Sequence, residues 1–138
     1  MKRHVLISIL LIISMAMLAS LIPGGPIETR DFSHLSPQTS QAFNACLTML
    51  GIASIVVGAL VWFRWRWTYI LAGLLSLGYI AVYVLDLAEI FPVSPSPMPQ
   101  LLWLIEWMGT ILALITIYYV IHALRGTDAS ERIPSHYI

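Results

Sequence analysis

Three carboxylates interrupt otherwise apolar stretches of the sequence. Asp86 and Glu89 lie in the segment YVLDLAEIF at residues 83–91, and Glu106 lies in the next apolar run. An acidic side chain at the centre of a bilayer costs on the order of 2.5–3.5 kcal/mol on insertion scales, so acids in such runs are rare and often mark binding sites. Two carboxylates that approach each other favour a shared proton or a bound cation over two bare charges. These residues therefore predict either a site for a cation or a proton or a closed, structural cluster of hydrogen bonds.

The composition indicates that these acids lie within a membrane. Of the 138 residues, 59% are hydrophobic and 10% are charged, against roughly 25% charged in ordinary soluble domains. Four apolar runs approach or exceed the roughly 18–20 residues that a helix needs to cross the hydrocarbon core. They cover residues 5–22, 42–63, 67–91 and 101–124. The sequence therefore predicts an all-α, integral membrane four-helix bundle that forms a single domain over residues 1–138.

The first apolar run has a second interpretation as a secretory signal. The basic segment Lys2-Arg3-His4 followed by VLISILLIISMAML resembles the charged and apolar regions of such a signal. However, the segment MLASLI offers no small-x-small cleavage site, and the apolar run continues to Ile22 before the turn sequence PGGP. We therefore expect the run to be kept as the first helix.

The basic residues predict the orientation of the bundle. Lys and Arg near the ends of spanning helices are enriched on the cytoplasmic side. Of the seven Lys and Arg residues, Arg30 alone lies between the first and second apolar runs. The other six lie on the opposite side of the predicted bundle: Lys2, Arg3, Arg64, Arg66, Arg125 and Arg132. We therefore expect both termini in the cytoplasm, with Asp86 and Glu106 in the outer half of the membrane.

Helical spacing gathers a set of polar side chains around these two acids. Asp86 lies roughly 7–8 Å along the helix from its expected end at Phe91, and Glu106 lies roughly 9 Å from Gln100, so their depths are similar. On three of the helices, polar and small residues recur at spacings of three and four and so share one face. The pocket predicted from these faces consists of Asp86, Glu106, Tyr79, Tyr83, Asn44 and Thr48.

The outer loop between the first two runs supplies a candidate lid for this pocket. Its sequence, PGGPIETRDFSHLSPQTSQ, is rich in turn-forming residues and contains Arg30. If the loop folds over the bundle, Arg30 would pair with a carboxylate at the mouth of the pocket.

Other kinds of chemistry receive little support from the sequence. His34 and Glu89 could join the two acids as metal ligands, but there is no His-x-x-x-His, Glu-x-x-His or cysteine-pair motif, so the metal is unknown and no cofactor is predicted. Cys46 is the only cysteine, which excludes dithiol redox chemistry. Nucleic-acid binding is not expected, because the net charge is zero and the basic residues are scattered.

These observations favour a small, non-enzymatic accessory or ligand- or cation-binding component of a membrane, most simply the bacterial inner membrane. Two alternatives remain open, a proton- or cation-coupled transporter that acts as an oligomer and a membrane-embedded enzyme. The expected partners are the lipid bilayer and either a larger membrane complex or further copies of the chain.

Overall fold

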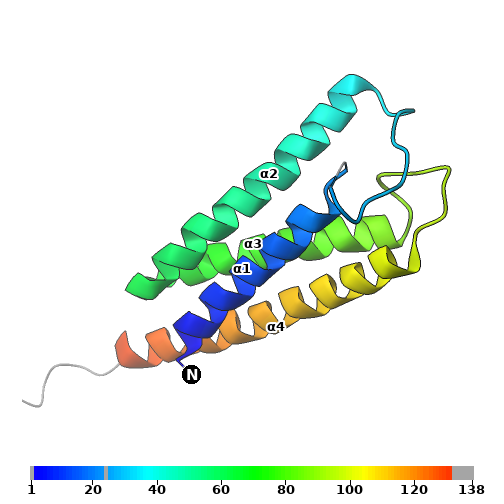
Figure 1. Cartoon of the computed structure of the whole chain (residues 1–138). Coiled ribbons are helices and arrows are strands. Elements are labelled where there is room, and N and C mark those ends of the chain that lie inside the picture. The colour runs from blue at the N-terminus through cyan, green and yellow to red at the C-terminus, as the bar shows by residue number, and fades with distance from the viewer. Residues whose placement is uncertain (1, 24, 132–138) are drawn as a thin grey trace, which may run out of the picture.

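The structure is a computed structural model that describes residues 2–23 and 25–131, with side chains described as far as residue 126. This part of the chain is all-helical, as the sequence predicts (Figure 1). Its elements are α1 (Arg3–Leu21), α2 (Pro37–Leu60), the short 3-10 helix η1 (Val61–Phe63), α3 (Arg66–Leu87) and α4 (Gln100–Glu131). By length and composition, all four α-helices are suited to cross a membrane.

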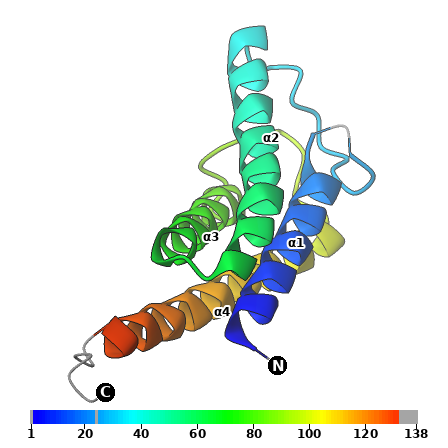
Figure 2. The same ribbon diagram turned by 90° about the vertical axis from the view of Figure 1, so that its left-hand side faces the viewer.

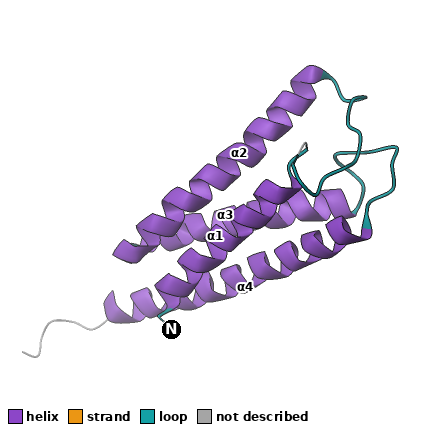
Figure 3. Cartoon of the chain, in the orientation of Figure 1, coloured by secondary structure: helices purple, strands orange, loops and turns teal. Residues whose placement is uncertain are grey.

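The two long connections lie together at one end of the bundle (Figure 3). We call this end, where α1 joins α2 and α3 joins α4, the loop end. The other end, with the N-terminus and the turn between α2 and α3, is called the terminal end. Helix α3 packs most closely with α4, and α1 packs against α2 and α4. Helix α2 diverges from the other helices toward the loop end (Figures 1 and 2).

Helix α2 begins at Pro37, earlier than residue 42 where the apolar run starts. Ser36 precedes it, and its Oγ accepts a hydrogen bond of 3.2 Å from the backbone N–H of Thr39. A capping serine followed by proline in the first turn is a common helix start. The polar segment SPQTSQ therefore belongs to the helix, although its hydropathy does not reveal this.

Helix α3 ends at Leu87, before the predicted end at residue 91. Glu89 adopts a left-handed conformation with φ 53°, and the N–H of Ile90 donates to the carbonyl of Leu85 at 3.0 Å. Such a left-handed residue with a backward hydrogen bond commonly ends a helix. As a result, Asp86 lies in the last turn of α3, at the loop end of the bundle.

Two groups of buried apolar side chains form the core. The group near the terminal end includes Ile7, Leu11, Val57 and Tyr69. The group near the loop end consists of Leu18, Leu21, Leu47, Tyr79, Tyr83, Leu102 and Ala113. Asp86 and Glu106 lie on the loop-end side of this second group.

One buried hydrogen bond joins α2 to α3 within this core. The Ser54 Oγ and Tyr79 Oη atoms are 2.7 Å apart, and both residues are 0% exposed. Ser54 also donates to the carbonyl of Leu50, one turn earlier in its own helix. Ser76 is similarly buried, but its described hydrogen bond is to the carbonyl of Ala72 within α3.

This difference makes Ser76 a matched control for Ser54. We expect Ser54→Ala to destabilise the protein by about 0.6 kcal/mol, the average for hydrogen bonds between membrane helices, and by at most about 1.7 kcal/mol, because Tyr79 loses its partner. Ser76→Ala should cost less, since no partner on another helix is lost. Unfolding in detergent or lipid would measure both. Equal costs would mean that the bond between α2 and α3 does not contribute to stability.

Candidate functional site

Arg30 forms a doubly bidentate ion pair with Glu28 and Asp86. Its Nη1 and Nη2 atoms donate to Oδ1 and Oδ2 of Asp86 at 2.9 and 2.7 Å. Its Nε and Nη2 atoms donate to Oε1 and Oε2 of Glu28 at 2.9 and 2.6 Å. The side chains of Arg30 and Glu28 are 3% and 2% exposed. We call these three residues the Arg30 network; it fastens the loop between α1 and α2 to the end of α3.

The loop sequence explains why Glu28 and Arg30 act together. In an extended segment, residues two apart point to the same side. Glu28, Arg30 and Phe32 follow this pattern, and the Arg30 guanidinium carbon lies 5.2 Å from the centre of the Phe32 ring. Asp31, between them, is exposed and accepts hydrogen bonds from the backbone and side chain of Ser33, which hold the pKa of its carboxyl below the usual range.

The guanidinium of Arg30 keeps its positive charge in this setting. Burial alone lowers the pKa of an arginine, but the hydrogen bonds and charges of Glu28 and Asp86 outweigh that effect and raise it above its usual range. One cation therefore faces two carboxylates, so the network with both acids ionised carries a net charge of about −1.

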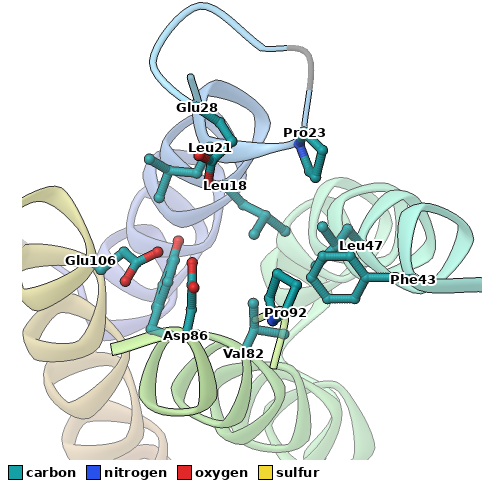
Figure 4. A pocket seen from close by; sticks show the side chains of 11 residues that line it. Leu18, Leu21, Pro23, Glu28, Phe43, Leu47, Val82, Asp86, Pro92 and Glu106 are labelled. Atoms are coloured by element: carbon teal, nitrogen blue, oxygen red, sulfur yellow. The ribbon is translucent and has the colours of Figure 1, made fainter. Parts of the chain in front are cut away.

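A small cavity lies directly beneath the network. Its volume is about 20 Å³, enough for one water-sized occupant. All four helices contribute to its walls, mostly with apolar side chains, and the polar groups that reach it are Glu28, Tyr83, Asp86 and Glu106. Figure 4 shows the carboxyl groups of Asp86 and Glu106 pointing into this space from α3 and α4. We call it the acidic pocket.

Glu106 and Tyr83 supply the groups in the acidic pocket that lack a partner. Glu106 is 2% exposed and Tyr83 is 1% exposed. Among the described residues, neither Oε2 of Glu106 nor the hydroxyl of Tyr83 has a hydrogen-bond partner. The Asp86 carboxyl is close enough to hydrogen-bond with that of Glu106. Buried polar groups are normally satisfied, so these two atoms point to an occupant of the pocket.

Gly109 makes room for Tyr83 beside Glu106. A Cβ atom at Gly109 would lie 2.6 Å from Cε2 of Tyr83 and 2.8 Å from its Cζ. The phenol ring is therefore pressed directly against the backbone of α4, one turn after Glu106.

The other predicted pocket residues lie outside the acidic pocket. The Tyr79 ring stacks on that of Tyr83, with centroids 6.2 Å apart, but its hydroxyl pairs with Ser54. Asn44 lines a separate cavity beside Phe32. Thr48 is exposed in an apolar groove between α1 and α2, and its hydroxyl donates to the carbonyl of Asn44. Helix α2 presents Phe43 and Leu47 to the acidic pocket, so Asn44 and Thr48, each one position further along, lie on a neighbouring face of the helix.

The residues considered as metal ligands are not brought together. His34 and Glu89 are both exposed, away from the acidic pocket. Within the described part of the chain, no group of three His, Cys, Asp or Glu side chains is arranged to hold a metal ion. Of the residues in the Arg30 network and the acidic pocket, Arg30, Asp86, Glu106 and Tyr83 were predicted from the sequence. Glu28 was missed, although its position two residues before Arg30 could have indicated it.

The Arg30 network predicts a large loss of stability for Arg30→Gln. Removing one partner of a buried ion pair typically costs about 3–5 kcal/mol, because the remaining charges stay buried without compensation. Arg64→Gln, at an exposed arginine, should change stability by less than about 0.5 kcal/mol. The double variant Arg30→Gln/Asp86→Asn should cost less than the sum of its single variants. Additive costs would show that Arg30 and Asp86 are not coupled.

The contact between Gly109 and Tyr83 predicts that Gly109→Ala destabilises the protein by about 1–3 kcal/mol through overpacking. Gly51→Ala is the control, because a Cβ atom there would lie 3.6 Å from Cγ of Met15, an ordinary contact. Thermal melts of both variants measure the effect. If Gly109→Ala were as well tolerated as Gly51→Ala, Tyr83 could not occupy the position described.

Comparison with known proteins places the chain in a family. No curated protein and no solved structure matches it. Residues 3–134 match the family described as Domain of unknown function (DUF8051). Since this match covers nearly the whole chain, the protein, with its four apolar helices and its buried Arg30 network, belongs to the DUF8051 family.

Proposed function

We propose that this protein is a small, non-enzymatic membrane component that binds a proton, or one water-sized cation, at Glu106 in the acidic pocket. The observation that carries the proposal is the buried Oε2 atom of Glu106, which has no partner among the described residues. It lies beside the Arg30 network, whose two acids already outnumber its one cation. A positive occupant would offset this excess of negative charge.

The size of the acidic pocket limits what it can bind. A cavity of about 20 Å³ holds one water molecule or an ion of similar size, but no sugar, amino acid or nucleotide. The polar small-molecule ligand suggested by the sequence is therefore less well supported than a proton or a simple cation.

The available ligands favour the proton over a metal ion. All four carboxylate oxygens of Glu28 and Asp86 already accept hydrogen bonds from Arg30. The other polar groups of the pocket are the Glu106 carboxyl and the Tyr83 hydroxyl, whereas Mg²⁺ and Ca²⁺ bind six or more oxygen ligands, more than these groups supply in a cavity of about 20 Å³. A proton needs only one acceptor, and the Tyr83 hydroxyl or a water molecule can hydrogen-bond to the protonated carboxyl.

The basic residues support an orientation with both termini in the cytoplasm. Lys2, Arg3, Arg64, Arg66 and Arg125 all belong to the terminal end, whereas Arg30 lies at the loop end. By the preference of basic residues for the cytoplasmic side, the acidic pocket faces outward, and a bacterial inner membrane is the simplest location.

A proton- or cation-coupled transporter acting as an oligomer is the second candidate. It is favoured by the position of the Arg30 network across the loop end of the acidic pocket, where opening and closing of the network would control entry. Transport also requires a path past the buried apolar side chains near the terminal end, which include Ile7, Leu11 and Val57. For this reason we favour a binding component.

Thermal melts across a pH series, with and without added Na⁺, K⁺ or Mg²⁺, test the proposal. We expect the melting temperature of the wild type to depend on pH or on a monovalent cation. Glu106→Gln should remove that dependence, because glutamine has nearly the shape of the protonated acid but cannot titrate. Glu89→Gln, which changes an exposed acid at the same end, should leave it intact.

The pattern of responses identifies the occupant. A response to pH alone indicates a proton, and a cation response at fixed pH indicates an ion. If wild type, Glu106→Gln and Glu89→Gln all respond alike, Glu106 binds neither, and the acidic pocket has only a structural role.

A further inference from the structure

A second feature, independent of the acidic pocket, lies between α3 and α4 in the half of the bundle nearest the terminal end. It is an open apolar groove of about 240 Å³, and its walls include Ile70, Leu74 and Leu77 from α3 and Ile121 from α4. A Cβ atom at Gly73 would lie 3.4 Å from Cγ1 of Val120. The two helices therefore approach closely along the floor of the groove, while Ile70, Leu74, Leu77 and Ile121 remain 43–58% exposed at its rim.

The groove, together with Arg66 beyond its end, spans one leaflet of a bilayer. Eleven residues separate Arg66, at the start of α3, from Leu77, which corresponds to roughly 16 Å along a helix. Half of a hydrocarbon core is about 15 Å thick. Trp65 and Trp67 flank Arg66 and are exposed, as expected for aromatic residues at the membrane surface. The groove thus lies within one leaflet, with Arg66 at headgroup level and Leu77 near the bilayer centre.

Two arginines lie at the headgroup end of the groove. Arg66 is one turn before Ile70 on α3, and Arg125 is one turn after Ile121 on α4. A spacing of four residues places each arginine on the same helix face as the groove residue next to it. Both arginines are exposed. Since a guanidinium carries five N–H donors, it can bind a phosphate group while also making contacts within the chain.

We propose that this groove binds an acyl chain of an anionic phospholipid and that Arg66 and Arg125 bind the phosphate of its headgroup. Basic sites between membrane helices at the cytoplasmic surface suit anionic headgroups. The other plausible occupant is an apolar helix from a second copy of the chain. An apolar helix supplies no counter-charge to the arginine pair, and its contacts would not need to end at the depth of one leaflet.

Native mass spectrometry of the protein with equimolar phosphatidylglycerol and phosphatidylcholine tests the headgroup site. We expect wild type to retain phosphatidylglycerol preferentially. If each arginine contributes roughly a fivefold preference, Arg66→Gln/Arg125→Gln should lower it roughly 25-fold. The control Lys2→Gln/Arg64→Gln removes the same charge from the same end of the bundle but not from the groove, and should keep most of the preference.

Spin-labelled phosphatidylglycerol in bilayers tests the acyl-chain site. Leu74→Trp should fill the groove and reduce the motionally restricted lipid signal, whereas Leu104→Trp, at another exposed leucine, should not. The proposal fails if wild type retains both lipids equally, if the two arginine variants lose the preference equally, or if both tryptophan variants behave alike. Conversion of a wild-type dimer to a monomer by Leu74→Trp would instead identify a second copy as the occupant and overturn it.

Discussion

The arrangement of the loop end depends on the pairing of one buried guanidinium with two carboxylates. Arg30 and Asp86 are 56 residues apart in sequence, and their contact holds the loop after α1 against the last turn of α3. A charge withdrawn from water in this way is stable only when its partners and hydrogen bonds are complete. Glu28 completes them from within the loop, so the loop brings its own counter-charge to the end of the bundle.

The same pairing determines which acid is available for binding. Glu28 and Asp86 use their oxygens on Arg30, whereas Oε2 of Glu106 faces the cavity beneath with no partner among the described residues. Tyr83 occupies the space that Gly109 leaves open, which brings a phenol hydroxyl to the same cavity. The site therefore has few ligands and little room, and this suits a proton better than a larger or more highly coordinated ligand.

Helical periodicity and hydropathy were sufficient to predict four apolar helices and to place Asp86, Tyr83 and Glu106 on facing surfaces. They could not predict the rotation of α2, which results from packing between distant segments and presents Phe43 and Leu47, rather than Asn44 and Thr48, to the acidic pocket. The ends of α2 and α3 were also misjudged, because they are determined by the Ser36 cap and the left-handed Glu89 rather than by hydropathy. Glu28 was missed because hydropathy and helical periodicity do not apply to a loop residue, and its position two residues before Arg30 was not used.

The most direct test of this account is the infrared spectrum of the protein in lipid, recorded in the carboxyl C=O stretching region as the pH is varied. If Glu106 binds the proton, wild type has a protonated-carboxyl band that disappears in Glu106→Gln and persists in Glu89→Gln. A band that remains in Glu106→Gln would contradict the assignment to Glu106. The absence of any such band in wild type, together with melting that ignores added cations, would contradict the proposal that the acidic pocket binds a positive occupant.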